Sequence, residues 1–546
     1  MKKISKLGFL LFLFAISTGL QAQFAITNPA EFEKNEGVLL VWDYAPSRDS
    51  ITANIARITQ TAGLVWIVYY PGAAPADTSQ IRNYLYSKGV SPLNLSFIPG
   101  WTETLWIRDY GPFTAYASFG GGLQRYVIDA GYSQYNRPKD DSVPAQLANY
   151  WNLPLQTLGL EVEGGNLIFD GLGRGFGSKR IWAQNPDLTP TQISSLLCEK
   201  FNLGDFIFLD NLNFSGGGIW KHVDMFMKVI DYETIMVSSY PEHLPDYAVI
   251  EANVGLLANL SNYFGKPYNI IRIPAPPKAN GSWATTENDE MRTYTNAFII
   301  NNTVIVPSYN LPEWDLQAKS IYEHAMPGYR IEMVDAQMLT ILGGAIHCVT
   351  KEVPSPHFNR IIHSKITGVQ PYNDVFVVPC QSASDTLVEQ MWLYYKVNQQ
   401  TQYNKVPVQL ICPVHLGLIE NLQPNDTVQY YLELVSSTDT ITYPGAAPDG
   451  GFTFWFDPVG IQEPLNEADG LSVFPNPAKS MVVLSGSNMI EGGKVRIHSA
   501  SGLLVNECNA SGEQMILSLD LQPGVYIISI NSPHGNSATK LVIEKQ

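Results

Sequence analysis

Short apolar runs alternate with helix-like segments over the first two thirds of the chain. The runs are rich in β-branched and aromatic residues, which is typical of strands. They lie at residues 37–42, 63–70, 125–128, 179–184, 205–209, 225–230, 234–238, 297–301, 303–307 and 330–335, and helix-like segments lie at 78–88, 189–201 and 316–325. The repeated pattern predicts a mixed α/β domain of several similar sub-units over residues 23–355.

Helical periodicity is weak in the rest of the chain. Strand-like segments with turn chemistry between them predict a small β-sandwich of immunoglobulin type over residues 356–458. The polar, acidic stretch 459–470 is typical of a linker, and residues 471–546 contain another set of short strands.

The N-terminus predicts export. Lys2, Lys3 and Lys6 precede a short apolar run at residues 7–20, and Ala22 provides a small residue for cleavage. Residues 1–22 therefore match a secretory signal peptide, because the run is too short to span a bilayer. No other stretch approaches the roughly 20 apolar residues of a membrane helix, so no membrane span is expected.

Composition narrows the choice of partners. The formal net charge of -16 argues against nucleic-acid binding, and the aromatic content of 11% favours a strand-rich protein. Five cysteines in 546 residues are too few for a disulfide scaffold, and their odd number leaves at least one thiol unpaired. Cys380 and Cys412 could pair within one module, which the sequence alone does not establish.

Three segments carry candidate chemistry. Cys348 follows a glycine pair at the end of a short apolar run, where a thiolate could act as a nucleophile; a buried structural cysteine is the alternative. In a strand, His222 and Asp224 would lie on one face as a proton shuttle and a carboxylate, although a structural histidine or a metal pair would fit the same pattern. Asp109 follows Trp106 before a Gly-Pro turn; an Arg-Asp-Tyr segment such as this is usually a surface ion pair.

Together these side chains suit a guanidinium substrate. A guanidinium is planar and always protonated, so its burial requires carboxylates in good geometry, and an aromatic ring can cover one face. Asp109 and Asp224 could hold the cation, Cys348 could attack its central carbon, and His222 could protonate the departing ammonia.

Residues 28–354 resemble the agmatine deiminase and bacterial peptidylarginine deiminase family of guanidino-modifying enzymes. The matching pieces are Trp106-Ile107-Arg108-Asp109, Glu163-Gly164-Gly165-Asn166, His222-Val223-Asp224, Tyr294-Thr295-Asn296 and Gly343-Gly344-Ala345-Ile346-His347-Cys348, in the family's order. The resemblance implies a pentein fold, which is a five-fold pseudosymmetric α/β propeller. Our interpretation of Glu163 to Asn166 is a tight structural turn.

The resemblance also implies roles and a reaction. Cys348 would be the nucleophile and His222 the general acid and then base, with Asp109 and Asp224 gripping the guanidinium. Asn296 would position substrate, and no metal or organic cofactor would take part. The product would be citrulline with release of ammonia.

Secreted members of this family carry an immunoglobulin-like domain and a sorting tail, and they hold the carboxylate of a C-terminal arginine with two arginines. The counterpart here is Arg137 and Lys139, and lysine loses the two-pronged hydrogen bonding of arginine. Residues 471–546 resemble the C-terminal sorting domain of type IX secretion cargo, through the Pro-Asn-Pro entry, the Ser501-Gly502 turn and the segment at residues 521–526. A carbohydrate-binding β-sandwich is the alternative for this region.

The sequence therefore predicts a secreted or cell-surface peptidyl-arginine deiminase whose partners are arginine-containing peptides and the type IX machinery. A deiminase of agmatine or another small guanidino compound is the nearest alternative. A papain-like cysteine protease would not need two aspartates, and a non-catalytic adhesin would not need all four reactive side chains.

Overall fold

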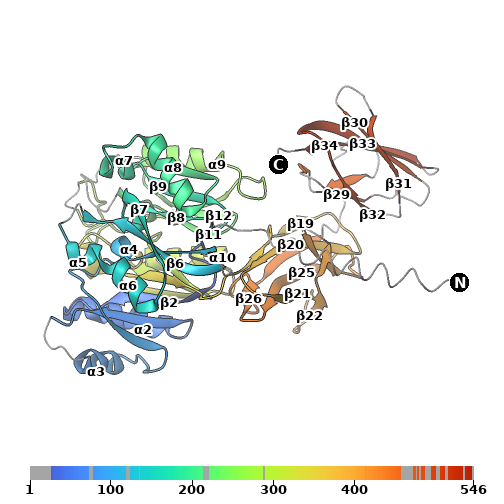
Figure 1. Cartoon of the computed structure of the whole chain (residues 1–546). Helices are drawn as coiled ribbons and strands as arrows, with labels where there is room; N and C mark the ends of the chain where they lie inside the picture. Colours follow the sequence, from blue (N-terminus) through green and yellow to red (C-terminus); the bar gives the residue numbers. More distant parts are fainter. Residues whose placement is uncertain are drawn as a thin grey trace. The chain divides into compact units, whose positions relative to one another are not determined.

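The computed structural model describes most of the chain, coloured from blue to red along the sequence in Figure 1. The described residues are 26–72, 78–118, 123–133, 136–212, 221–286, 289–411, 414–456, 471–474, 476–478, 481–485, 493–499, 504–510, 514–532 and 535–543. They fall into two compact units that divide between Asp457 and Pro458. The expected signal peptide at residues 1–22 and the expected linker at 459–470 lie outside the described residues.

Five small sheets lie within residues 26–354 of the first unit, which we call the deiminase-like part after the family resemblance of its sequence. The sheets have the orders β1-β5-β6-β7, β10-β9-β8, β11-β12-β13, β14-β15-β16 and β17-β2-β3-β4. Their strands are β1 (Ile26–Thr27), β2 (Asn35–Val41), β3 (Leu64–Tyr69), β4 (Leu95–Pro99), β5 (Phe113–Ser118), β6 (Leu123–Gly131), β7 (Leu155–Glu161), β8 (Ile168–Phe169), β9 (Arg174–Ser178), β10 (Asp205–Leu209), β11 (Met227–Asp231), β12 (Thr234–Ser239), β13 (Asn269–Pro274), β14 (Phe298–Ile300), β15 (Thr303–Ser308), β16 (Arg330–Asp335) and β17 (Lys351–Pro354). Each sheet combines an antiparallel pair with a parallel one.

Helices connect the strands of these sheets (Figure 1). They are α2 (Pro46–Thr59), α3 (Ser79–Ser87), α4 (Ile107–Tyr110), α5 (Pro138–Asp141), α6 (Val143–Trp151), α7 (Arg180–Gln184), α8 (Pro190–Phe201), α9 (Tyr247–Ala258), α10 (Pro312–Ala325) and α11 (Gln337–Thr340), with the short 3-10 turns η2 (Gly164–Asn166), η4 (Val223–Met225) and η5 (His347–Val349). Sequential strands that pair in parallel, such as β15 and β16, need a crossover of this kind, and α10 supplies it.

The predicted strand at residues 179–184 is wrong, because this segment forms the helix α7. Trp182 donates its backbone N–H to Lys179, and the Asn185 side chain closes the turn by donating to the Ile181 carbonyl at 2.8 Å. Ile181 and Arg180 are the buried residues of this segment. The Arg180 guanidinium pairs with the Glu163 carboxylate. Tertiary pairing therefore decides the local conformation of this short segment.

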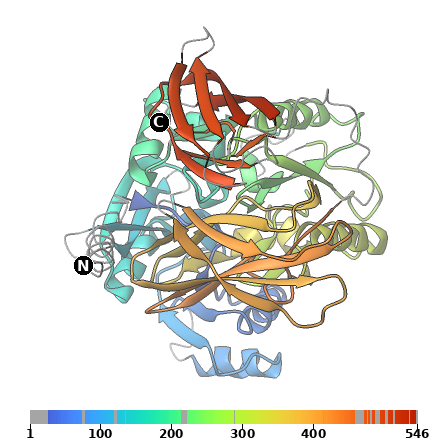
Figure 2. The same ribbon diagram turned by 90° about the vertical axis from the view of Figure 1, so that its right-hand side faces the viewer.

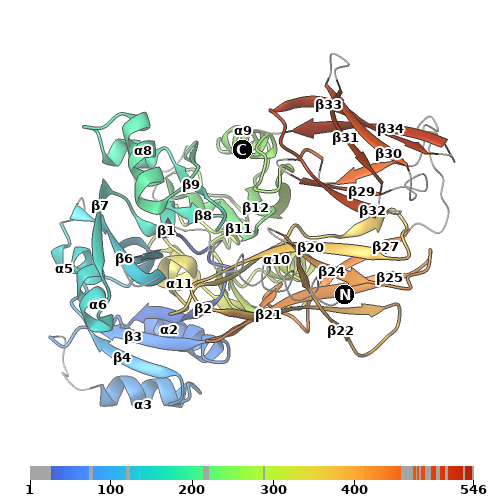
Figure 3. The same ribbon diagram turned by 45° about the vertical axis from the view of Figure 1, so that its right-hand side comes forward.

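Strands alone make up the described residues from 359 to 456, apart from turns. They form two sheets, β18-β20-β24-β23 and β19-β27-β25-β21-β22 with β26 beside β25, whose strands are drawn in orange tones in Figures 2 and 3. Side chains of both sheets belong to the same hydrophobic core. The strands are β18 (Asn359–Ile362), β19 (Gly368–Gln370), β20 (Phe376–Ser384), β21 (Val388–Val397), β22 (Asn404–Pro407), β23 (Gln409–Ile411), β24 (Val414–Ile419), β25 (Thr427–Ser436), β26 (Thr440–Tyr443) and β27 (Phe452–Phe456). Cys380 in β20 is a buried free thiol, and Cys412 lies outside the described residues.

This region belongs to the same compact unit as the deiminase-like part. The Arg360 guanidinium pairs with Glu33, and the Lys365 ammonium lies 2.6 Å from Asp231. One large cluster of buried residues includes side chains of both parts, from Ala30 to Phe456, so the two parts share an apolar interior.

The second unit contains two sheets, β28-β29-β32 and β31-β30-β33-β34. The strands are β28 (Ser472–Phe474), β29 (Met481–Ser485), β30 (Lys494–Ser499), β31 (Leu504–Asn509), β32 (Gln514–Ser518), β33 (Gly524–Ser532) and β34 (Gly535–Ile543). Its buried residues form a hydrophobic core of their own. In the part of the chain that the structure describes, no helix has the length and apolar character needed to cross a membrane.

Candidate active site

Three of the predicted site residues converge on one glycine. A methyl group at Gly165 would lie 2.8 Å from His222 Nδ1, 2.9 Å from Asp109 Oδ1 and 3.0 Å from Asp224 Oδ2. The backbone at Gly165 does not need a positive φ, so the glycine provides space and not an unusual conformation. All four residues are buried, and the space above Gly165 is bounded by an imidazole and two carboxylates.

His222 and Asp224 reach this space from a turn. The predicted strand through both residues is wrong, because residues 223–225 form η4 and strand β11 begins only at Met227. The Asn166 side-chain oxygen accepts the backbone N–H groups of Val223 and Ser178, both at 3.0 Å, and so ties η4 to β9 and to η2. The turn still presents both side chains to Gly165.

Asp109 lies in α4, a single helical turn before Gly111 and Pro112. Its Oδ1 accepts the Gly165 N–H at 3.2 Å and lies 3.5 Å from His222 Nδ1. The neighbouring Arg108 is 2% exposed, so the surface ion-pair interpretation of this segment is wrong. Arg108 is paired inside the protein with Glu352 at 2.6 Å, and it donates to the His347 carbonyl at 3.2 Å.

Cys348 lies in η5, on a different segment of the chain from the residues around Gly165. Its Sγ is 3.5 Å from the side-chain oxygen of Asn296, which also accepts the backbone N–H of His347 at 3.0 Å. A methyl group at Gly344 would lie 3.0 Å from Cys348 Cβ and 2.5 Å from the Trp106 ring. Trp106 therefore lies against the segment that carries the thiol, and Asn296 fixes the backbone of that segment.

The charges of the site alter the titration of its groups. Burial raises the pKa of Asp109 to about 6, although His222 acts against this shift. Burial alone would lower the pKa of His222, but the carboxylates of Asp109 and Glu163 raise it above its usual value. Burial raises the pKa of the Cys348 thiol well above its usual value, and the charges of Asp224 and Asp109 raise it further. The thiol thus responds to both aspartates, as expected if all three share one site.

Glu163 is a site residue that sequence reasoning missed. We interpreted its segment as a structural turn, yet its carboxylate is fully buried and lies 3.5 Å from His222 Nε2. Arg180 pairs with it at 2.7 Å, and Gln184 donates to it. Burial alone would raise the pKa of Glu163, but His222 and Arg180 hold it well below its usual value. A carboxyl next to two glycines was the available signal, because such a segment lets other side chains approach closely.

Among the described residues, no contact that the structure gives joins Lys139 to Cys348 or to the three side chains at Gly165. Arg137 precedes α5, and Lys139 Nζ lies 4.8 Å from the centre of the Tyr70 ring. The backbone N–H of Lys139 donates to Glu103, three residues before Trp106. The turn therefore lies beside the loop that leads into the site.

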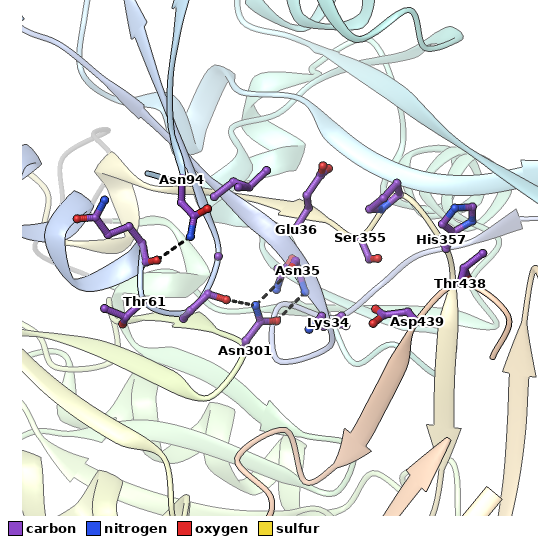
Figure 4. A pocket seen from close by; sticks show the side chains of 15 residues that line it. Lys34, Asn35, Glu36, Thr61, Asn94, Asn301, Ser355, His357, Thr438 and Asp439 are labelled. Carbon is purple, nitrogen blue, oxygen red and sulfur yellow. Dashed lines mark hydrogen bonds between the residues drawn. The ribbon is translucent and has the colours of Figure 1, made fainter. Parts of the chain in front are cut away.

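Two pockets lie away from the predicted site residues. Figure 4 shows one of about 450 Å³, lined by polar residues that include Asn35, Asn94 and Asn301. The other, of about 700 Å³, is lined by residues of the deiminase-like part and of the β-strand region that follows it, among them Tyr232 and Tyr443. Neither pocket is lined by a predicted site residue. In the described residues, no group of three or more His, Cys, Asp or Glu side chains is placed to hold a metal ion.

Solved structures share the fold of the deiminase-like part. An agmatine deiminase of Enterococcus faecalis matches with a TM-score of 0.53 and 19% identity, over 61% of this chain and 97% of that protein. An agmatine deiminase of C. jejuni matches with a TM-score of 0.50 and 22% identity, over 60% of this chain and 96% of that protein. This part of the chain has a pentein-like deiminase fold built from mixed sheets.

Sequence comparison gives the family. The chain belongs to the Porphyromonas-type peptidyl-arginine deiminases, whose family model matches residues 27–354. It is 25% identical to the agmatine deiminase of Pseudomonas fluorescens strain SBW25 over 369 residues, which cover 61% of this chain and 96% of that protein. The protein is therefore a hydrolase that acts on the C–N bonds of amidines.

The second unit matches a different family of domains. Residues 472–544 match the secretion system C-terminal sorting domain. The protein is a secreted or cell-surface protein that uses the type IX secretion machinery.

The space at Gly165 gives a direct test of the site. We expect Gly165→Ala to lower kcat/KM for a guanidino substrate by about 100-fold, because the methyl group fills the space between the imidazole and the carboxylates. Gly255→Ala is the matched control, since a methyl group on this exposed residue of α9 meets nothing within 4 Å. Ammonia release and thermal unfolding would be measured for both variants. Full activity of a folded Gly165→Ala protein would place the substrate elsewhere.

Proposed function

We propose that the protein is a secreted peptidyl-arginine deiminase, which converts arginine residues of peptides or proteins to citrulline and releases ammonia. The observation that carries the proposal is the convergence of Asp109, Asp224 and His222 on Gly165, and the charges of both aspartates also raise the pKa of the Cys348 thiol. Paired carboxylates can satisfy the donors of a flat cation, and glycine at position 165 keeps a side chain from intruding between them.

The reaction begins when the Cys348 thiol loses its proton to solvent and the resulting thiolate attacks the central guanidinium carbon. The tetrahedral adduct collapses with cleavage of one C–N bond, and His222 donates a proton to the departing ammonia. A covalent amidino-thioether remains on Cys348. The raised pKa of His222 supports this role, since the ring carries the proton that the leaving group needs.

Water then completes the reaction. His222, now neutral, removes a proton from a water molecule that attacks the same carbon, and the C–S bond breaks. The ureido product leaves, and the proton on His222 is retained for the next turnover. Glu163 and Asp109 face the two ring nitrogens of His222 at 3.5 Å, so they stabilise the protonated form and hold the ring in place.

The substrate itself can help to activate the thiol. The carboxylates of Asp109 and Asp224 raise the pKa of Cys348 in the unoccupied protein. A guanidinium bound between them would offset both negative charges, and this change favours the thiolate next to the carbon that it attacks.

The remaining parts of the chain fit an exported enzyme. We propose that the five small sheets are the blades of a five-fold pseudosymmetric propeller over residues 23–355, followed by an immunoglobulin-like β-sandwich over 356–458. A linker at 459–470 would lead to an all-β sorting domain at 471–546, which is removed or processed after export. The signal peptide at residues 1–22 remains a prediction.

The main alternative is a deiminase of agmatine, and the names of several relatives favour it. Export favours peptides, because small-molecule deiminases act inside cells. For a C-terminal arginine, Arg137 and Lys139 would hold the carboxylate, and their place beside the loop before Trp106 is compatible with this role.

Steady-state kinetics separates these substrates. Citrulline formation would be measured on matched peptides with internal, N-terminal and C-terminal arginine, and ureido product formation on agmatine. We expect at least one peptide to give a kcat/KM above that of agmatine. Efficient turnover of agmatine without turnover of any peptide would overturn the peptide assignment.

A further inference from the structure

A second histidine, His347, links Asp224 to a carboxylate from the start of the deiminase-like part. Its Nδ1 lies 2.7 Å from Asp224 Oδ2, and its Nε2 lies 2.6 Å from Glu31 Oε2. His347 is 2% exposed, and its backbone N–H is held by Asn296. The ring therefore bridges two carboxylates that are 193 residues apart in sequence, since 224 − 31 = 193.

Glu31 is itself held firmly. Its Oε1 accepts from Lys228 Nζ and from the Ile299 backbone N–H, both at 2.7 Å, and Arg108 approaches Oε2 at 3.7 Å. Burial alone would raise the pKa of Glu31, but Lys228, His347 and Arg108 hold it well below its usual value. Glu31 is thus a fixed anion, and its second oxygen is directed at His347.

Asp224 is consequently held by one oxygen only. Its Oδ2 contacts His347, whereas the buried Oδ1 has no hydrogen-bond partner in the part of the chain that the structure describes. A buried carboxylate oxygen without a donor is costly, and a guanidinium N–H would satisfy it.

We propose that Glu31 and His347 are positioning residues that clamp the Asp224 carboxylate through Oδ2, the oxygen that faces Gly165, so that its unpaired Oδ1 can accept from the substrate guanidinium. This inference rests on the proposed deiminase function. Both carboxylates accept hydrogen bonds from the ring only when both of its nitrogens carry a proton, so the clamp requires His347 as the cation between two anions. His347 differs from His222, because it acts through Asp224 and does not take part in proton transfer to the leaving group.

Glu31→Gln tests the clamp, because glutamine keeps the shape and removes the charge. It also leaves Lys228 without its anion, which can destabilise the fold by itself. The double variant Glu31→Gln/Lys228→Met removes both charges, and Lys228→Met alone keeps the contact of Glu31 with His347. These three variants and the wild-type protein would be compared by thermal unfolding. Separate kcat and KM values would be measured for agmatine and for an arginine peptide.

We expect kcat/KM to fall about 100-fold in Glu31→Gln, mostly through a higher KM, because Asp224 loses its fixed orientation. Lys228→Met should lower the activity less than Glu31→Gln does, because Glu31 keeps its contact with His347. The double variant should recover thermal stability without recovering activity. If the double variant recovered both thermal stability and activity, Glu31 would have only a structural role, and this result would overturn the clamp.

A second measurement does not depend on activity. The 15N shifts of the His347 ring, assigned by comparison with His347→Asn, report whether both nitrogens carry protons in the full-length wild-type protein. We expect both to be protonated, with one lost in Glu31→Gln; a neutral ring in wild type would overturn the clamp. Wild-type protein that releases no ammonia from any guanidino substrate would instead overturn the proposed function, while the ring shifts would still decide the clamp.

Discussion

Cys348→Ala should lower kcat by roughly 10⁴-fold or more, because loss of the attacking atom of a covalent mechanism removes the whole chemical route. Substrate binding should change much less, since the aspartates remain in place. Binding of a guanidino substrate by the inactive variant, measured by calorimetry, would separate the loss of chemistry from a loss of the site. The wild-type protein should accumulate an amidino adduct visible by mass spectrometry on the peptide that contains Cys348.

Cys380→Ala is the matched control for this variant. Cys348 and Cys380 are both buried free thiols, and burial raises the pKa of Cys380 to about 12. Cys380 lies in β20, outside the deiminase-like part, so its replacement should leave kcat unchanged. Equal losses in the two variants would indicate a general effect of emptying a buried thiol site and would contradict the assignment of Cys348 as the nucleophile.

Asp224→Asn should have the second largest effect. The amide has the size of the carboxylate but lacks its charge, and an unpaired buried cation loses about 3–5 kcal/mol of stabilisation. At about 1.4 kcal/mol for each factor of ten, kcat/KM should fall roughly 10²–10⁴-fold. Much of the loss should appear as a higher KM, because Asp224 contacts the cation before the chemistry begins.

Asp49→Asn provides the comparison for this variant. Asp49 is a buried aspartate of α2, and burial raises its pKa to about 7, with further effects from Asp43 and Arg48 rather than from any site residue. Its replacement should leave both kinetic parameters near those of wild type. If Asp224→Asn retains wild-type KM with arginine peptides and with agmatine, Asp224 does not hold the guanidinium.

The regular elements were largely predictable from the sequence because their apolar runs are long enough to reveal a period. The runs at 205–209 and 330–335 coincide with β10 and β16. Prediction failed at 179–184 and at His222 to Asp224, where single turns form. The conformation of such short segments is set by contacts from elsewhere, such as the Asn166 oxygen that holds η4.

The residues of the site were likewise predictable only in part. Cys348, His222, Asp109 and Asp224 were singled out because each lies in a short segment with recognisable chemistry, and the structure brings the last three together at Gly165. Glu163, Arg108 and Glu31 were not, because their significance depends on partners that are distant in sequence. Arg108 was taken for a surface residue, and nothing local to Glu31 indicates that it lies 2.6 Å from His347.

Among the described residues, each unit has buried apolar clusters of its own: those of the first unit end at Phe456, and that of the second begins at Leu471. The sorting domain is therefore a module that can be exchanged as a unit. Evolution could attach it to, or remove it from, an enzyme of this kind without rebuilding the interior that supports the chemistry. The β-strand region before it has no such separate core, because its buried side chains belong to the same cluster as those of the deiminase-like part.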